Sequence, residues 1–418
     1  MNIHLQSLGC RLNQSEIETL ARQFAAAGHA VVPTPAQADV CIVNTCAVTT
    51  AAERKSRHQI RALSRANPET RAAVIGCYAT LAPRRCTALP GVAWVVPNAE
   101  KERTVEIVTA SSHVSSRREK KMKAAPLRTR AFVKVQDGCD NHCTYCITRL
   151  LRGPARSRPV ADVVAEVQRL VETGCQEAVL TGVNLGSYGR DLGLSDGLYT
   201  LVRTLLAHTD LPRLRLSSLE PWDLDEVFFS LWEHSRLCRQ LHLPLQAGCD
   251  ETLRRMGRRV TEREFARLVQ AIHAAVPDLA VTSDIIVGFP GEDEAAFRAS
   301  YDFVAAIEFA RLHVFPYSPR PGTAAARLPD QTPRQVRQAR ARAMRELGAK
   351  QASHFRQRFV GREMEVVWEQ RRRDGLWTGL TDNYLRVTTH GEGNLHNRLT
   401  ATQLLAAQNG CLVGEVID

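Results

Sequence analysis

The sequence lacks the two features that direct a chain into or across a membrane. No stretch of the 418 residues is apolar enough to form a membrane-spanning helix. The first ten residues, MNIHLQSLGC, have neither a basic start nor an apolar core, so they do not read as a secretory signal. We therefore expect a cytoplasmic protein with no membrane partner. In that compartment thiols stay reduced, so the twelve cysteines point to metal binding or catalysis rather than to disulfides.

Acidic residues are scarce relative to basic ones. The chain has 55 Lys and Arg against 44 Asp and Glu, for a formal net charge of +11. This balance is typical of proteins that bind a polyanion, most often nucleic acid, although a basic surface without such a partner fits the charge equally well. The length suits two or three domains, and 44% hydrophobic residues are enough to build their cores.

The pattern of apolar residues predicts an α/β protein of three domains. Residues 1–110 alternate strand and helix and predict a small parallel sheet domain, followed by a basic linker over 111–130. Residues 131–358 contain strand–helix repeats typical of a partial (β/α)6 barrel and end in a long Arg-rich helix. Residues 359–418 read as short strands with Gly and Asn turns, which fits a small β-barrel.

The repeats of the middle domain can be placed individually. We expect its strands near Phe132–Gln136, Glu177–Thr181, Arg213–Ser217, Leu241–Leu245, Ala280–Val287 and Leu312–Phe315. We expect its helices near Val160–Glu172, Gly197–Ala207, Asp223–His234, Glu262–Ala274 and Glu294–Ala305.

Three cysteines follow the first barrel strand with the spacing C-x3-C-x2-C, at Cys139, Cys143 and Cys146. Three thiolates can hold three irons of a 4Fe–4S cluster and leave the fourth iron free to bind S-adenosylmethionine, whose one-electron cleavage gives a 5′-deoxyadenosyl radical. The loop after a barrel strand is also where such barrels place their chemistry. The alternative is zinc, which would need a fourth ligand such as His142.

A second group of cysteines occurs in the N-terminal domain. Cys10, Cys46 and Cys77 each follow an apolar run, in the sequences SLGC, VNTC and VIGC. Parallel strands end at one edge of a sheet, so we expect these cysteines to be neighbours in space. Gly9 and Gly76 precede two of them and permit close approach of the backbone. The sequence thus predicts a second cluster site, the alternative being three buried core cysteines.

This order of features resembles the methylthiotransferase family over essentially the whole length. Family members have three separated cysteines in an N-terminal domain, a C-x3-C-x2-C barrel and a C-terminal barrel of the TRAM type. The resemblance implies two 4Fe–4S clusters, S-adenosylmethionine, and insertion of sulfur and a methyl group into an unactivated C–H bond. Five stretches resemble the branch that acts on C2 of N6-threonylcarbamoyladenosine at tRNA position 37: NTCAVTTAAERKSR, TGVNLGSYG, LSSLEP, TSDIIVGFPGE and FPYSPRPGTAAARLP.

The resemblance also implies roles for individual residues. Tyr145, Asn184, Ser217 and Glu220 are candidates to bind S-adenosylmethionine. Asn383 and Tyr384, together with Arg371, Arg372 and Arg373, are candidates to contact RNA by stacking and by phosphate binding. Partners would be tRNA and an electron donor such as flavodoxin or ferredoxin, and we expect a monomer.

Some stretches depart from the family pattern, and three other functions stay open. After the radical cluster the family has an I-x-P-x-x-R-G-like run, where this chain reads ITRLLRG from Ile147 to Gly153. The same chemistry could act on isopentenyladenosine in tRNA or on an aspartate of a ribosomal protein. A non-catalytic RNA-binding iron–sulfur protein is the third alternative, but it does not explain an open-iron motif on a barrel loop.

Overall fold

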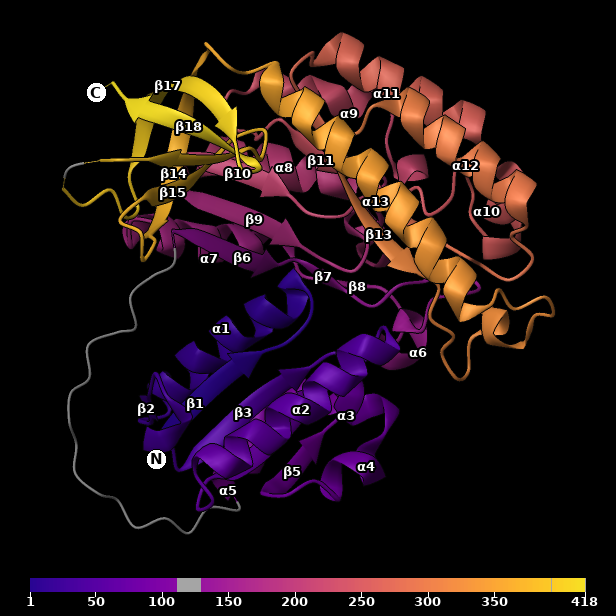
Figure 1. The fold of residues 1–418 in the computed structure, drawn as a ribbon. Coiled ribbons are helices and arrows are strands. Elements are labelled where there is room, and N and C mark those ends of the chain that lie inside the picture. Colours follow the sequence, from indigo (N-terminus) through magenta and orange to yellow (C-terminus); the bar gives the residue numbers. More distant parts are fainter. Residues whose placement is uncertain (111–128, 392, 418) are drawn as a thin grey trace.

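The computed structural model describes residues 1–110, 129–391 and 393–417. Figure 1 shows an N-terminal α/β body, a larger α/β body beside it, and a small barrel at the C-terminus. Of the predicted basic linker, 111–128 lie outside the described residues. Arg130, expected to belong to that linker, is instead the first residue of strand β6 (Arg130–Lys134), and its Nε donates to Glu369 at 2.8 Å.

The N-terminal domain is a five-stranded parallel sheet, as predicted, with strand order β2-β1-β3-β4-β5. All six residues of β3 are buried, so this central strand is covered on both faces, and its first four residues form a continuous apolar run. The edge strands β2 and β5 were not predicted. The elements are β1 (Asn2–Ser7), α1 (Arg11–Ala26), β2 (Ala30–Val31), β3 (Val40–Thr45), α2 (Thr50–Ala66), β4 (Arg71–Gly76), α3 (Cys77–Leu81), α4 (Pro83–Thr87), β5 (Val92–Val96) and α5 (Thr104–Ala110).

The middle domain is a partial barrel of six parallel strands, which confirms the predicted class. Two three-stranded sheets, β10-β9-β6 and β11-β12-β13, are joined by parallel bridges that include Ser218 with His242. Its strands are β6, β9 (Glu177–Thr181), β10 (Arg213–Leu216), β11 (Gln240–His242), β12 (Ala280–Val287) and β13 (Arg311–Pro316), and a short pair, β7 (Gln136–Asp137) with β8 (Arg156–Ser157), follows β6. Its helices are α6 (Thr148–Arg152), α7 (Val160–Glu172), α8 (Gly197–His208), α9 (Glu226–Phe229), α10 (Asp250–Met256), α11 (Glu262–Ala275), α12 (Glu294–Ile307) and α13 (Arg334–Gln357).

One predicted helix is much shorter than expected. The pattern predicted a helix over Asp223–His234, but only α9 is α-helical there. The side chain of Asp225 accepts a hydrogen bond from the backbone N–H of Phe228 at 2.9 Å, so Asp225 caps a helix that begins at Glu226. The residues on either side of α9 form short 3₁₀ turns. Local side-chain hydrogen bonds such as the Asp225 cap compete with the longer helix that the apolar periodicity predicts.

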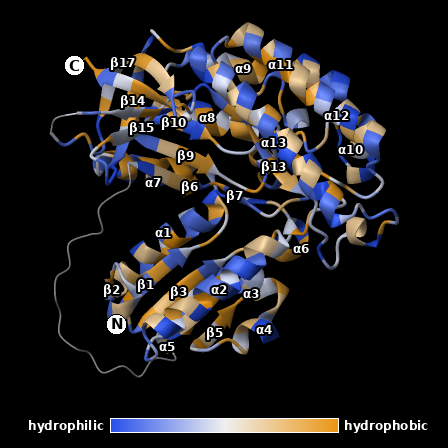
Figure 2. Cartoon of the chain, viewed as in Figure 1, coloured by the Kyte–Doolittle hydropathy of each residue, from blue (hydrophilic) through white to orange (hydrophobic). Residues whose placement is uncertain are grey.

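The C-terminal domain is a closed barrel with strand order β14-β15-β16-β18-β17, again as predicted in class. The strands are β14 (Glu363–Arg371), β15 (Trp377–Thr381), β16 (Arg386–Thr389), β17 (Leu399–Gln408) and β18 (Cys411–Val416). Strand β17 was not predicted. Trp368 is fully buried at the centre of this small core. In Figure 2 many strands carry hydrophobic colours, whereas the helices show both hydrophilic and hydrophobic faces.

Buried arginines dock the C-terminal barrel onto the beginnings of strands β9 and β10. Arg215 pairs with Glu177 through its Nε at 2.7 Å and donates to the carbonyl oxygen of Thr381 at 3.1 Å. Arg213 donates to the carbonyl oxygen of Leu380 at 3.1 Å. The C-terminal barrel therefore closes the end of the (β/α) barrel opposite to the strand ends where a barrel carries its chemistry.

This docking corrects one sequence prediction. The turn at Asn383 and Tyr384 was expected to be exposed and to contact RNA. Instead Asn383 is 1% exposed, and the Tyr384 hydroxyl accepts a hydrogen bond from Arg11 of the N-terminal domain at 2.7 Å. The guanidinium of Arg215 lies 4.9 Å from the centre of the Tyr384 ring. Asn383 and Tyr384 therefore lie at the contact between domains. Arginine cations that face an aromatic ring stabilise it, which favours this buried position of the Tyr384 ring.

Candidate active site

The C-x3-C-x2-C loop begins directly after β7, at the carboxyl end of the first barrel strand. Gly138 before it has a φ of +70°, and a Cβ there would lie 1.8 Å from the carbonyl oxygen of Pro154, so the loop can turn only with glycine. Each cysteine sulfur of the loop faces an N–H donor. Asn141 N approaches Cys139 Sγ at 3.4 Å, Thr148 N approaches Cys146 Sγ at 3.4 Å, and Arg258 Nη1 approaches Cys143 Sγ at 3.8 Å.

These donors fit sulfurs that carry negative charge. Burial raises the pKa of Cys139 to about 11 and also raises the pKa of Cys146. Such thiols keep their protons unless a cation binds them, and a bound iron centre supplies that charge. Hydrogen bonds from N–H groups to cluster sulfurs are a usual means of tuning such centres. The loop thus has the donor set and the surroundings of an iron–sulfur site.

The structure brings the N-terminal cysteines together at one edge of the sheet. Cys10 precedes α1, Cys46 follows β3, and Cys77 is the first residue of α3. Gly9 has a φ of +106°, and a Cβ on it would lie 2.7 Å from the Cβ of Cys46, so the close approach predicted from the sequence is confirmed. Burial, together with the neighbouring Cys77 and Cys10, raises the pKa of Cys46 to about 11.

The separation of the sulfurs favours clusters over a single ion. Zinc–sulfur bonds of about 2.3 Å would hold three sulfurs within roughly 4 Å of one another. In the described part of the chain, the one group of three potential ligands with all ligand atoms within 4.8 Å is His242, Asp284 and His313. Neither cysteine triplet is that compact, as expected for thiolates on different irons of a cube. The residues present therefore fit two iron–sulfur clusters.

Helix α6 joins the two cysteine groups. It begins two residues after Cys146, and its Leu151 packs in the same apolar cluster as Cys77. Leu151 also accepts a hydrogen bond through its carbonyl oxygen from Asn98, whose amide nitrogen Nδ2 lies 3.6 Å from Cys77 Sγ. The last residue of α6, Arg152, pairs with Glu16 of α1 at 3.0 Å. The two cysteine groups thus meet at the interface between the first two domains.

A cavity of about 310 Å³ opens beside the C-x3-C-x2-C loop that carries Cys139, Cys143 and Cys146, which we call the radical-type loop. It is lined by all three cysteines of that loop and by Val48 and Thr49, which follow Cys46 in the N-terminal domain. One cavity therefore receives side chains from both domains. A site at a domain interface with a few polar groups among apolar walls is typical of substrate binding.

Three of the four residues predicted to bind S-adenosylmethionine line this cavity. Tyr145, Asn184 and Glu220 do, whereas Ser217 does not: it is 6% exposed, and its neighbour Ser218 takes the place expected for it. Side chains alternate between the two sides of a strand, so a prediction that is wrong by one residue at the end of β10 names a side chain that points away from the cavity. Glu220 Oε2 accepts a hydrogen bond from Arg258 at 2.6 Å, which fixes its orientation in the wall.

Several cavity residues were not singled out from the sequence. Arg149 lines the cavity at a position where the family-like run would carry proline. Gln246 lines it with a φ of +76°, a strained backbone conformation for a non-glycine residue that is enriched at functional sites. Asp284 and Phe315 reach it from β12 and β13. The sequence could have indicated Asp284 and Phe315 as site residues by their position on predicted barrel strands, since residues toward the carboxyl ends of such strands build the site.

The three arginines predicted to contact RNA are exposed. Arg371, Arg372 and Arg373 lie at the end of β14 and in the turn that leads to β15. Arg371 donates to the carbonyl oxygen of Gly375, and Arg372 pairs with Asp374 at 2.8 Å. Their contact with RNA stays a prediction. No helix in the described residues is long and apolar enough to cross a membrane.

The chain matches two known families. Residues 2–96 match the uncharacterized protein family UPF0004, and residues 133–304 match the radical SAM superfamily. The fold is similar to that of a radical S-adenosylmethionine methyltransferase, TsrM, from Kitasatospora setae, with a TM-score of 0.58 over 78% of this chain and 77% of that chain at 16% identity.

Full-length relatives are more similar in sequence. The threonylcarbamoyladenosine tRNA methylthiotransferase MtaB of Bacillus subtilis is 34% identical over 97% of this chain and 94% of the relative. The protein of the same name from Thermotoga maritima is 36% identical over 92% of this chain and 90% of the relative. A tRNA-2-methylthio-N(6)-dimethylallyladenosine synthase from Desulfitobacterium hafniense is 32% identical over 97% of this chain and 95% of the relative. With both cysteine groups at one domain interface and relatives of this similarity along its length, the chain belongs to the radical S-adenosylmethionine methylthiotransferase family.

Proposed function

We propose that this enzyme attaches a methylthio group to C2 of N6-threonylcarbamoyladenosine at position 37 of tRNA. The observation that carries the proposal is the similarity, along more than nine-tenths of the chain, to two methylthiotransferases named for that nucleoside. The cavity lining is compatible with it, since Asp284 places a carboxylate in the wall and the substituent of this nucleoside is itself polar.

Six cysteines would hold the two metal centres. Cys139, Cys143 and Cys146 would ligate the 4Fe–4S cluster that, with S-adenosylmethionine, supplies radical chemistry, and Cys10, Cys46 and Cys77 would ligate a second cluster that supplies sulfur. Helix α6 connects the two groups, and the cavity beside the barrel loop is also lined by Val48 and Thr49, which follow Cys46. The backbone N–H groups of Asn141 and Thr148 hold two sulfurs of the radical-type loop in place.

Other residues would position the cosubstrate. Tyr145 lies between two ligands of the radical-type loop and would pack against S-adenosylmethionine. Glu220, oriented by Arg258, would accept a hydrogen bond from the amino group of S-adenosylmethionine. Asn184 is held by Asp223, whose carboxylate accepts from its side-chain amide at 3.2 Å, and would bind a polar group of the methionine or ribose. Ser218, which lines the cavity, replaces Ser217 in this role.

The partners follow from the same reaction. The net charge of +11 and the exposed Arg371–Arg373 turn suit binding of tRNA, which is found in the cytoplasm, so the enzyme would act there. The reaction requires an electron donor such as flavodoxin or ferredoxin. We expect a monomer, which sedimentation would test.

The test is an anaerobic assay of reconstituted enzyme with three substrates. These are tRNA bearing threonylcarbamoyladenosine, tRNA bearing isopentenyladenosine, and ribosomal protein with the target aspartate. We expect the methylthiolated nucleoside to form from the first substrate at least tenfold faster than from the second and not from the ribosomal protein, measured by mass spectrometry of the digests. Faster reaction with isopentenyladenosine tRNA would replace the proposal by the second candidate, which the Desulfitobacterium relative supports. Product on the ribosomal protein, or no product at all, would also refute it.

A further inference from the structure

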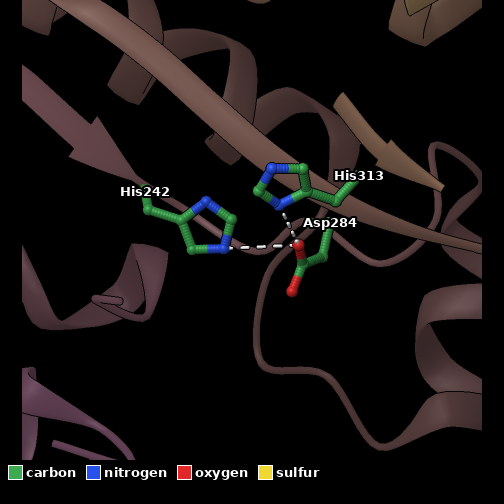
Figure 3. A group of neighbouring side chains, drawn as sticks. All are labelled: His242, Asp284 and His313. Atoms are coloured by element: carbon green, nitrogen blue, oxygen red, sulfur yellow. Dashed lines mark hydrogen bonds and ion pairs between the residues drawn. The ribbon is translucent and has the colours of Figure 1, made fainter. Parts of the chain in front are cut away.

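Three polar side chains inside the (β/α) barrel have no part in holding the clusters or the cosubstrate. His242 is the last residue of β11, Asp284 lies in β12 and His313 in β13. Asp284 is directly opposite His313 in the register of β12 and β13, and Thr282, two residues before Asp284, is opposite His242. Three neighbouring strands therefore present these side chains to one another, as Figure 3 shows.

Both imidazoles contact the same oxygen of the Asp284 carboxylate. His313 Nδ1 lies 3.2 Å from Oδ1, and His242 Nε2 lies 3.4 Å from it. The other nitrogen of His242, Nδ1, is 3.0 Å from the Thr282 hydroxyl, which donates its own proton to the carbonyl oxygen of Leu241. Both ring nitrogens of His242 therefore have a partner, the Thr282 hydroxyl on one side and the Asp284 carboxylate on the other.

The Asp284 carboxylate is suited to stay ionised. Burial by itself would raise its pKa, but hydrogen bonds from His242 and His313 hold the pKa well below its usual range. Its second oxygen, Oδ2, has no hydrogen-bond partner among the residues that the structure describes. Nε2 of His313 is likewise without one, and 43% of the His313 side chain is exposed. One carboxylate oxygen and one ring nitrogen are thus left for a ligand.

Asp284 connects this group to the reaction cavity. Asp284 lines it together with the cysteines of the radical-type loop, and so do Ile286 and Phe315, which follow Asp284 and His313 by two residues on the same faces of their strands. The group is therefore placed to contact a molecule that also lies against the radical-type loop. A few convergent polar atoms on an otherwise apolar wall are what fixes the orientation of a bound ligand.

We propose that His242, Asp284 and His313 form the subsite that binds the N6 substituent of the target adenosine and selects a ureido acid over an apolar chain. The proposal rests on the proposed function and names the residues of its specificity. A threonylcarbamoyl group carries N–H donors, a hydroxyl and a carboxylate. Asp284 Oδ2 accepts from an N–H of the ureido linkage, and His313 Nε2 donates either to the hydroxyl oxygen or to the carboxylate of the ligand when both nitrogens of the ring carry a proton. An isopentenyl group offers no partner to either residue.

The energetics favour discrimination of this kind. A site built to hydrogen-bond its substrate rejects an analogue that lacks the partner groups, because the polar groups of the site then lose water without replacement. The same three residues have the ligand types of a metal site, and their ligand atoms lie within 4.8 Å of one another. In the structure both imidazoles contact Asp284 Oδ1 directly, which leaves Oδ2 and His313 Nε2 for an organic ligand, and metal analysis of the variants tests the ion.

The test compares reconstituted variants on two tRNAs that differ only at N6, one with threonylcarbamoyl and one with isopentenyl. His313→Phe keeps a ring in β13 and removes both nitrogens, and His313→Gln restores one N–H donor. Asp284→Asn keeps the shape and removes the charge. His208→Phe, on the exposed end of α8, is the matched control for loss of an imidazole. The readouts are kcat and KM for each tRNA, 5′-deoxyadenosine formed without tRNA, and metal content.

We expect His313→Phe and Asp284→Asn to lower kcat/KM on threonylcarbamoyladenosine tRNA at least tenfold, mainly through KM, and to leave the isopentenyladenosine reaction and 5′-deoxyadenosine formation within twofold. His313→Gln should recover part of the loss, and His208→Phe should behave as wild type. The subsite would be overturned by equal losses on both tRNAs or by no loss on either. It would also be overturned if the wild-type chain held one zinc or other non-iron ion that is absent from His313→Phe. If wild-type enzyme prefers isopentenyladenosine tRNA, the proposed function falls with it, an outcome visible before any variant is made.

Discussion

At the scale of single residues, the two cysteine groups differ in their surroundings. Those of the radical-type loop face backbone and arginine N–H donors within one short loop. Those of the N-terminal domain come from three separate strand ends and depend on glycines that no other residue can replace. A Cβ on Gly76, at a φ of +93°, would lie 2.3 Å from the Asn44 side-chain oxygen. Losing one N-terminal cysteine should therefore affect only its own group.

We expect Cys77→Ala to separate the two half-reactions. Two thiolates hold a 4Fe–4S cube poorly, so iron content should fall from about eight to about four per chain. The methylthio product should disappear, while cleavage of S-adenosylmethionine to 5′-deoxyadenosine should persist, because Cys139, Cys143 and Cys146 are intact. The measurements are iron analysis, 5′-deoxyadenosine and modified nucleoside, all without oxygen.

Two further variants bracket this result. Cys143→Ala should abolish cleavage of S-adenosylmethionine altogether. Cys41→Ala should leave both reactions close to wild type, since Cys41 is fully buried in the middle of β3 and packs in the core. Full product from Cys77→Ala would show that the second cluster is not on these residues.

At the scale of elements, the short helix α6 carries the connection between domains. Arg152 at its end is 6% exposed and contacts Glu16 at 3.0 Å, Asp137 at 2.7 Å and Asn13 at 2.7 Å. A buried charge with three partners is costly to remove, because those partners stay buried without it. Burial would raise the pKa of Glu16, yet Lys101, Arg152 and Lys134 lower it strongly, so Glu16 stays ionised.

We expect Arg152→Gln to loosen this interface. The loss should be about 3 kcal/mol, in the range for breaking a buried ion pair, and should lower the apparent unfolding midpoint by several degrees. Product formation should fall more than 5′-deoxyadenosine formation, because transfer of the methylthio group needs both domains at one cavity. Arg169→Gln, at an exposed position of α7, is the control. A midpoint and product yield equal to those of the control would show that Arg152 does not hold the domains together.

At the scale of the whole molecule, the C-terminal barrel is an integral part of the structure. Arg213 and Arg215 reach from the middle domain into its backbone, and Tyr384 reaches back to Arg11. Deleting residues 359–418 would expose these buried arginines and destabilise the enzyme. The role of this barrel in RNA binding is therefore better tested at its surface.

We expect replacement of Arg371, Arg372 and Arg373 by Gln to weaken tRNA binding and to spare 5′-deoxyadenosine formation. Each lost phosphate contact removes about 0.7 to 0.9 from the slope of log affinity against log salt, so the slope should fall by about two. The measurement is a binding titration at several salt concentrations. Replacing Arg169, Arg263 and Arg267 by Gln changes the net charge equally on exposed helices and is the control. Equal effects from both triple variants would mean that only overall charge matters.

Much of the architecture was already determined by the sequence, because it depends on local periodicity and spacing. Continuous apolar runs gave the parallel strands, and strands Glu177–Thr181 and Ala280–Val287 have the predicted bounds. The rule that parallel strands end at one edge was sufficient to bring Cys10, Cys46 and Cys77 together. Strand β17 was missed, since its alternation of polar and apolar residues fades after Leu404 and pairing with β14 and β18 decides its conformation.

Contacts between distant segments were decided only by the tertiary structure. The sequence shows Asn383-Tyr384 as a polar turn, but burial depends on Arg11, Arg130 and Arg215, which lie in other domains. Ser217 and Ser218 differ in environment only because a strand alternates its sides. The meeting of His242, Asp284 and His313 is of the same kind, since it requires the register of three strands whose residues are up to 71 positions apart. Hydrogen bonds and charges act through space over a few ångströms, and only the folded chain fixes which side chains come that close.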